Sequence, residues 1–195
     1  FILLTSLIET VPFYANISGV YAAYHKKWDP RAKKRLVLKN IELINNEREN
    51  YVYNDDSINL LNEHQYDIIY LDPPYNQRQY APNYHILETI AKYDNPKIKG
   101  VTGMRDYSLQ KSKFCNKVTA LIELEKIISN TNAKHIVLSY NNEGIMPEEE
   151  IKQIFTKYGE LKYYEYEYLR YKSNNNGSSK SKKNIIEQIY ILNRS

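Results

Sequence analysis

One apolar run, YDIIYL at residues 66–71, constrains the fold of this chain most strongly. Its β-branched and aromatic residues predict a strand that is buried on both faces of a sheet, and the run ends abruptly at Asp72-Pro73-Pro74. Residues 51–53 (YVY) and 135–140 (HIVLSY) are expected to form two further strands. Because apolar residues recur at helical spacing between these runs, the sequence indicates an α/β fold.

The order of the expected elements predicts the topology. A strand, a helix, a strand, two helices, a strand, a helix and two final strands indicate a mostly parallel sheet with helices on both faces. The last two strands, at residues 161–169 and 185–192, adjoin along the chain and so predict one antiparallel strand at the C-terminal end. The clearest helix has Pro147 at its first position, three glutamates in its first turn, and Gly159 as its stop.

The first forty residues differ in character from the rest. Residues 3–8 have the spacing of a helix, Pro12 is expected to interrupt it, and a second helix is expected at residues 20–28. Residues 26–39 are the most basic segment, in which Asp29 is the only acid. We expect residues 1–195 to form a single domain, with residues 1–40 as a helical, basic part and residues 51–195 as the α/β part that carries the chemistry.

Charge and cysteine content limit the partners and the compartment. The net charge of +4 permits a polyanionic partner without requiring one. A single cysteine, Cys115, excludes a disulfide framework and a thiolate metal cluster, so we expect no metal site and a reducing, cytoplasmic environment. The most apolar stretch, residues 1–8, is far shorter than the roughly 20 residues that span a bilayer. The chain also begins at Phe1 in a helical pattern without a Met, which indicates part of a longer protein.

The tetrapeptide Asp72-Pro73-Pro74-Tyr75 follows the best strand at the edge where open α/β sheets bind their ligands. A plain turn is one interpretation, because Asp and Pro commonly end strands. The other is chemical: the Asp72 carboxylate and the Pro73 carbonyl can each accept an N–H of an exocyclic amine, so that its lone pair can attack a methyl donor. Tyr75 could then stack on a base taken out of its duplex, since such stacking returns roughly 1 to 3 kcal/mol.

Four segments carry a resemblance to a known family: IIYLDPPYNQRQYAPNYHIL (residues 68–87), TGMRDY (102–107), IVLSYNNEG (136–144) and NISGVYAAYHKKWDPRA (16–32). They resemble the Dam-like class of DNA adenine-N6 methyltransferases, specifically its type II modification methylases. The resemblance implies part of a Rossmann-like methyltransferase sheet. It also implies site-specific methyl transfer from S-adenosyl-L-methionine to a flipped adenine in duplex DNA, and it makes a cognate restriction endonuclease a candidate partner.

The resemblance implies roles for particular residues. Asp72, Pro73 and Tyr75 match the family's catalytic motif, and Asp72 would also lie beside the cofactor's sulfonium. Asp55 or Asp56 matches the acidic position near the cofactor adenine, although two such aspartates can equally cap the next helix. Tyr84 and His85 begin the helix that lines the cofactor pocket in the family, and a satisfied, partly buried histidine is the alternative for His85.

One family feature is missing from the sequence. The glycine-rich FxGxG loop, through which the family's backbone approaches the methionine part of the cofactor, has no counterpart here, because no two of the six glycines lie two residues apart. The family's first two strands are therefore expected upstream of Phe1. On this view the cofactor pocket of the chain alone is incomplete, and binding of S-adenosyl-L-methionine by the chain alone is expected to be weak or absent.

Several polar, aromatic and basic residues are candidate DNA contacts. Basic residues that alternate with aromatic ones suit a phosphate-binding surface, and a solvated helix face is the alternative. In the resembling segment Asn16 or Tyr21 would contact bases, while Lys26 and Lys27 would only position the duplex. Arg78 and Tyr80 are candidates near the flipped base, and Lys182 is a candidate in the basic segment 172–183. Arg105 is a further candidate, for which an internal ion pair with its acidic neighbour is the alternative.

Two other classes of function fit the same residues. DPPY also occurs in RNA methyltransferases that act on adenine or guanine amines, whereas methyltransferases that modify protein glutamine usually carry Asn at the position of Asp72. A non-catalytic remnant that binds DNA or a partner would explain the missing glycine loop. The flanking segments favour the DNA enzyme over both.

Overall fold

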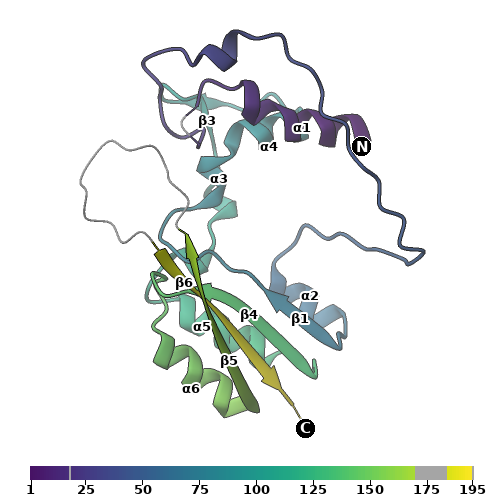
Figure 1. The fold of residues 1–195 in the computed structure, drawn as a ribbon, viewed down its shortest axis with the longest axis vertical. Coiled ribbons are helices and arrows are strands. Elements are labelled where there is room, and N and C mark those ends of the chain that lie inside the picture. Colours follow the sequence, from purple (N-terminus) through teal and green to yellow (C-terminus); the bar gives the residue numbers. More distant parts are fainter. Residues whose placement is uncertain (18, 170–183, 195) are drawn as a thin grey trace. The chain divides into compact units, whose positions relative to one another are not determined.

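A computed structural model describes residues 1–17, 19–169 and 184–194 of the chain (Figure 1). The chain divides into two compact units. The first comprises Phe1–Tyr51 and Gln79–Lys111, and the second comprises Val52–Arg78 and Ser112–Ser195. The expected parts 1–40 and 51–195 do not coincide with these units, because residues 79–111 pack with the N-terminal residues. A single domain that spans the whole chain stays a prediction.

The second unit contains a four-stranded mixed sheet in the order β1 (Ile68–Leu71), β4 (His135–Asn141), β6 (Asn184–Asn193) and β5 (Glu160–Leu169). β1 pairs with β4 in parallel, whereas β6 pairs antiparallel with both of its neighbours. The α/β class and the antiparallel C-terminal strand are confirmed. Three strands share one direction as expected, but β6 lies between β4 and β5, so two of the three pairings are antiparallel rather than mostly parallel.

Two strand predictions were wrong. Residues 51–53 form no strand, and all three side chains are exposed. β1 forms, but it is not buried on both faces: Ile68 and Tyr70 are 64% and 62% exposed, while Ile69 and Leu71 pack against the core. The reason is its place in the sheet, since among the described residues β1 is an edge strand whose one neighbour is β4.

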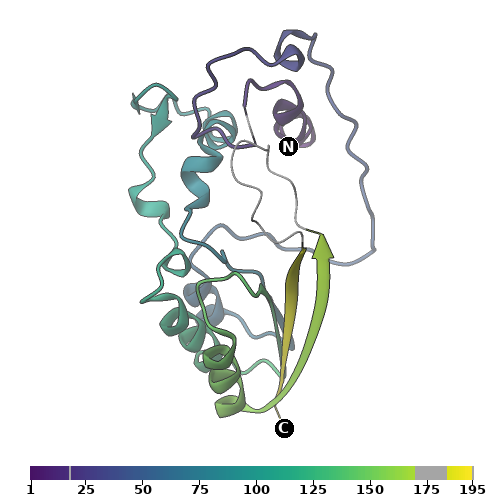
Figure 2. The ribbon, with the colours of Figure 1, turned by 60° about the vertical axis from the view of Figure 1, so that its left-hand side comes forward.

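Helices cover one face of this sheet. α5 (Ala120–Ser129) and α6 (Glu148–Tyr158) pack over it, as the teal and green helices beside the strands in Figure 2 show, and α2 (Ser57–Glu63) packs beside α5. The core between them contains Leu124, Ile136, Leu138, Ile151, Phe155 and Tyr190. On the opposite face, which we call the bare face, Ile68, Tyr70, Tyr164, Tyr166 and Tyr168 are exposed. Within the described part of this unit, the expectation of helices on both faces was therefore wrong.

The first unit is built around two helices, α1 (Ile2–Tyr14) and α4 (His85–Lys92). It also contains the short helix α3 (Tyr80–Asn83), the strand pair β2 (Ile98–Lys99) and β3 (Met104–Arg105), and the 3-10 turns η1 (Pro30–Lys33) and η2 (Ser108–Gln110). A third such turn, η3 (Lys113–Cys115), belongs to the second unit. No described helix is long and apolar enough to cross a membrane.

Two helix predictions for the first unit were wrong. Pro12 does not interrupt the first helix: α1 continues through it and ends two residues later at Tyr14, so the hydrogen bond that the proline cannot make is lost close to the helix end. Residues 20–28 form turns instead of a helix. Their backbone bonds to other segments instead: the Tyr21 N–H donates to the Asn83 carbonyl at 2.9 Å, and Gly19 adopts a left-handed φ of 93°.

Candidate active site

The Asp72-Pro73-Pro74-Tyr75 loop leaves the carboxyl end of β1 and is held at its last residue. The Tyr75 carbonyl accepts hydrogen bonds from the Ile145 N–H at 2.9 Å and from the Tyr140 hydroxyl at 3.4 Å. Both donors belong to β4 and the loop that follows it, which are parts of the same unit. The Tyr75 backbone is thereby fixed, while its ring is 42% exposed and the Asp72 side chain is exposed. This arrangement leaves a carboxylate and an aromatic ring accessible at the edge of a rigid sheet.

Tyr140 supports the loop from within the core. Its side chain is buried, and burial raises the pKa of its hydroxyl, which therefore stays protonated and can donate to Tyr75. The same oxygen accepts from the Met146 N–H at 3.2 Å. Gly144 is required next to it, because a Cβ at that position would lie 2.1 Å from the Tyr140 ring. Sequence reasoning did not assign this role to Tyr140 or Gly144, although both belong to the segment IVLSYNNEG that carried the resemblance.

A second carboxyl group belongs to the electrostatics of this site. Glu187 lies on β6 opposite Asn141 of β4 and is half-buried. Burial raises the pKa of Glu187, and the negative charge of Asp72 raises it further. Asp72 follows β1 and Glu187 lies on β6, so β4 lies between the two residues in the sheet. No sequence signal distinguished Glu187 from other glutamates on the final strands.

Asp55 and Asp56 have local partners. Asp56 is the N-cap of α2, since its Oδ1 accepts from the Ile58 N–H at 2.9 Å. Asp55 Oδ1 accepts from the Asp56 N–H at 2.6 Å and from Asn59 Nδ2 at 3.1 Å. These contacts support the capping interpretation, and a contact of either aspartate with the cofactor stays a prediction.

Tyr84 and His85 lie in the first unit, and each has an aromatic partner there. His85 is fully buried, with its Nε2 3.4 Å from the Tyr21 carbonyl oxygen and its ring edge-to-face with the Tyr21 ring. The rings of Tyr80 and Tyr84 are nearly parallel, with centroids 6.1 Å apart, and help to line a cavity of about 400 Å³ with Ile8 and Leu87. His85 is buried and packed, but its Nδ1 has no hydrogen-bond partner among the described residues, so it is not a satisfied histidine. The Tyr84 ring is exposed, and a contact of either residue with the cofactor stays a prediction.

Some of the candidate DNA contacts are exposed, and others already bind residues of the chain itself. Lys26, Lys27, Tyr80 and Arg78 are exposed. Asn16 Oδ1 accepts from the Asp29 N–H at 2.7 Å. The Arg105 guanidinium is buried and binds both carboxylate oxygens of Asp94 at 3.1 and 2.5 Å, so its internal ion pair is with Asp94 rather than with its neighbour Asp106. Lys182 lies outside the described residues.

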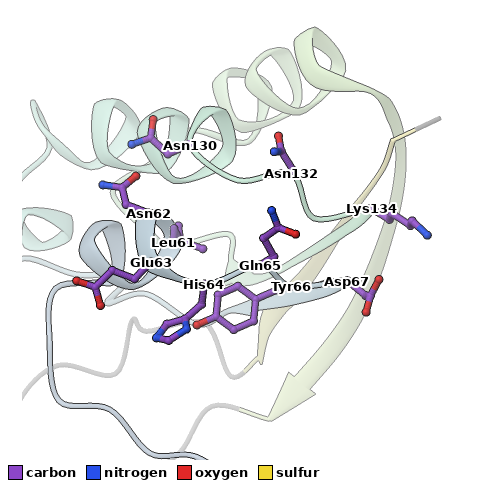
Figure 3. A pocket seen from close by; sticks show the side chains of 10 residues that line it. All are labelled: Leu61, Asn62, Glu63, His64, Gln65, Tyr66, Asp67, Asn130, Asn132 and Lys134. Atoms are coloured by element: carbon purple, nitrogen blue, oxygen red, sulfur yellow. The ribbon is translucent and has the colours of Figure 1, made fainter.

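A larger cavity lies at the other end of the sheet. It has a volume of about 570 Å³ and lies before β1 and β4 begin, whereas Asp72 follows the end of β1 (Figure 3). Its lining is mostly polar: Leu61, Asn62, Glu63, His64, Gln65, Tyr66, Asp67, Asn130, Asn132 and Lys134. Among the described residues, no three His, Cys, Asp or Glu side chains are grouped so as to hold a metal ion. The accessible loop after β1 remains the candidate active site.

The comparisons with known proteins agree on one family. Residues 1–154 match the family described as D12 class N6 adenine-specific DNA methyltransferase. The chain is 46% identical over 174 residues to the type II methyltransferase M.FokI of Planomicrobium okeanokoites, which covers 88% of the chain and 27% of that protein. It is 37% identical over 195 residues to the type II methyltransferase M.NlaIII of Neisseria lactamica, 58% of whose length it spans. The modification methylase StsI of Streptococcus sanguinis is 38% identical, over 98% of the chain and 29% of its own length. No solved structure matches the chain.

Proposed function

The chain belongs to the D12 class of N6 adenine-specific DNA methyltransferases, and on this premise we propose the activity of the protein that contains it. That protein transfers a methyl group to the N6 amino group of an adenine flipped out of duplex DNA, at a specific sequence, as a restriction-modification methylase. Because the chain spans 27% to 58% of the relatives named above, the activity belongs to the longer protein rather than to these residues alone. A cognate restriction endonuclease is the candidate partner.

The observation that carries this proposal is the fixed backbone and accessible side chains of the loop after β1. With the Tyr75 carbonyl bound by Ile145 and Tyr140, the Asp72 carboxylate is presented at the sheet edge. Asp72 and the Pro73 carbonyl would each accept one N–H of the adenine amino group. Tyr75 would stack on the ring, which offsets part of the few kcal/mol that flipping costs.

The described residues fit the methyl acceptor better than the cofactor. Family members use S-adenosyl-L-methionine, which supplies the methyl group when bound. The Asp72 carboxylate suits its positive sulfonium. In the described part of the second unit, however, Gly144 and Gly159 are packed against Tyr140 and against the Asn193 carbonyl, so neither leaves open backbone for a ligand. We therefore propose that the chain alone binds the cofactor weakly or not at all.

Nucleoside analysis tests the proposed function. The full-length protein that contains this chain is incubated with duplex DNA and S-adenosyl-L-methionine. The DNA is then digested to nucleosides. N6-methyladenine is expected, and Asp72→Asn should abolish it. Asp67→Asn is the matched control, since Asp67 is an exposed aspartate at the other end of β1. Methylated cytosine, or methylation of RNA alone, would contradict the proposal, and DNA binding without any methylation would favour the non-catalytic alternative.

A further inference from the structure

The strand pair β2–β3 of the first unit is a short hairpin whose turn is specified by the sequence. The two strands pair over their last and first two residues, so residues 100–103 make the turn. The Gly103 N–H donates to the Gly100 carbonyl at 3.3 Å and closes it. The two glycines have left-handed φ angles of 65° and 70°, which other residues rarely adopt. The tip of the hairpin therefore has a defined geometry.

A buried ion pair anchors the base of this hairpin. The Arg105 guanidinium on β3 is buried and donates to both carboxylate oxygens of Asp94, at 3.1 and 2.5 Å. It also donates to the Thr89 hydroxyl of α4 at 3.4 Å, and β3 lies beside this helix (Figure 1). A bidentate pair of this kind fixes the orientation of both groups. The chain before β2 and the strand β3 are thus tied to each other and to α4, while the tip extends beyond them.

The tip is apolar and exposed, and basic side chains flank it. Val101, the second residue of the turn, is 78% exposed. Lys97 and Lys99 are exposed too, and among the described residues neither forms an ion pair. Asp106 accepts hydrogen bonds from the Ser108 N–H and hydroxyl, which lower its pKa together with the charge of Lys99. The hairpin therefore presents an aliphatic side chain between two cations that are free to bind an anionic partner.

These features fit the major groove of duplex DNA. The groove admits a two-stranded β-ribbon and is about 8.5 Å deep. Val101 lies three residues beyond Ile98, the partner of the anchored Arg105, and a strand rises about 3.3 Å per residue, so the tip can reach the base edges from the groove rim. On the floor of the groove, the C5-methyl group distinguishes thymine from the other bases, and an aliphatic side chain can contact it.

We propose that the β2–β3 hairpin enters the major groove of the DNA substrate and that Val101 contacts the methyl group of a thymine there. Lys97 and Lys99 bind the flanking phosphates, which positions the hairpin without reading the sequence. This inference rests on the proposed function, because it takes duplex DNA as the substrate. It gives Val101 a part in sequence recognition, a task separate from holding the flipped adenine.

Removing the thymine methyl groups from the DNA tests this contact. One long duplex is copied with thymidine triphosphate and again with deoxyuridine triphosphate, so that the two products differ only in their C5-methyl groups. The affinity of the full-length protein for each is measured by competition. The wild type should prefer the thymine duplex. Val101→Ala should lower the affinity for this duplex roughly 3- to 10-fold, because it removes apolar contact area, and should leave the affinity for the uracil duplex unchanged.

Matched variants separate base contact from other effects. Val118→Ala is the control, because Val118 is 77% exposed in the second unit, and it should change neither affinity. Val101→Ile keeps a branched aliphatic side chain and should retain the preference for thymine. Lys97→Gln should weaken binding to both duplexes equally, since phosphate contacts do not read the base.

The outcomes distinguish this inference from the proposed function. If Val101→Ala weakens binding to both duplexes equally, or to neither, the hairpin does not read a thymine methyl group, and the inference is overturned while the proposed function stands. If the wild-type protein does not bind duplex DNA at all, the proposed function is refuted and the inference falls with it.

Discussion

The two faces of the four-stranded sheet are built by the same strands and yet have opposite characters. The face under α5 and α6 contains aliphatic and aromatic side chains that are fully buried, among them Leu138, Ile151 and Phe155. The bare face exposes tyrosines and contains Glu187, and Asp72 follows β1 on that side. The comparison teaches that one face supplies the packing that holds the strands in place. Among the described residues of this unit no helix packs on the other face, which leaves its tyrosine side chains exposed.

The largest effect is expected when a buried side chain under the helices is shortened and the result is compared with the same change on the bare face. Phe155→Ala should lower the free energy of unfolding by about 3–5 kcal/mol, because the ring is fully buried beside Tyr190. Tyr166→Ala, on the bare face, removes a ring of similar size that is 68% exposed, and its effect should stay within about 0.5 kcal/mol. Urea titrations of the two variants measure both changes. Equal losses would mean that the bare face also carries packing.

A smaller effect is expected when the exposed ring at the site is removed. Tyr75→Ala should weaken the capture of a flipped adenine by about 1–3 kcal/mol, the usual value of one base–aromatic stacking contact. The fluorescence of 2-aminopurine placed at the target position reports the flipped state in the longer protein. Tyr164→Ala is the control, since its ring is similarly exposed on β5. If both variants capture the base equally well, Tyr75 has no stacking role.

The covered face also contains a charged pair whose contribution depends on pH. A hydrogen bond from Lys152 lowers the pKa of Glu148 below its usual 4.5, and Glu148 Oε2 accepts from Gln188 Nε2 at 2.8 Å. A lowered folded pKa stabilises the fold above pH 4.5, and this stabilisation is lost as the pH falls through the folded value. Glu148→Gln should remove about 0.5–1 kcal/mol at neutral pH, since the pair is partly exposed.

Denaturant titrations at several pH values between 3 and 7, roughly the range over which carboxylates titrate, measure this dependence. The stability of Glu148→Gln should change less with pH than that of the wild type. Glu149→Gln is the control, because Glu149 is 79% exposed and its oxygen lies 3.6 Å from the Lys152 ammonium. An unchanged pH dependence in Glu148→Gln would assign the acid sensitivity to other carboxyl groups.

The smallest expected effect concerns the salt dependence of DNA binding. It tests whether the DNA phosphates lie on the basic segment of the first unit or on the bare face. If Lys26 and Lys27 neutralise phosphates, the slope of log affinity against log salt should flatten by about 0.9 for each contact that their reversal to Glu removes. Lys162→Glu, on the bare face, should leave the slope unchanged if that face holds the base rather than the DNA backbone. Binding to duplex DNA over a salt series measures both, and a flattened slope in Lys162→Glu would place phosphates on the bare face.

Sequence patterns predicted the elements whose signals are local. The helix after Pro147 forms at Glu148–Tyr158, because its first-turn glutamates and Gly159 specify both ends, and the HIVLSY run forms β4. The patterns failed where a distant partner decides. The apolar composition of β1 does not reveal that its outer side lacks a described neighbour, and Asn83 supplies the bond that holds Tyr21 in a turn. At the site, DPPY was visible from the sequence, whereas the support from Tyr140 depends on the pairing of β1 with β4.

The Tyr140 hydroxyl joins the loop after β1 to the loop after β4, so amide exchange can measure how the two loops open. The Ile145 and Met146 amides are protected from exchange with solvent only while the Tyr75 carbonyl and the Tyr140 oxygen accept from them. Because both bonds depend on the same packed ring, the loop after β1 and the loop after β4 should open in one cooperative event. The two amides should then exchange with one common opening free energy, which measures the fraction of molecules in which the loop after β1 is open.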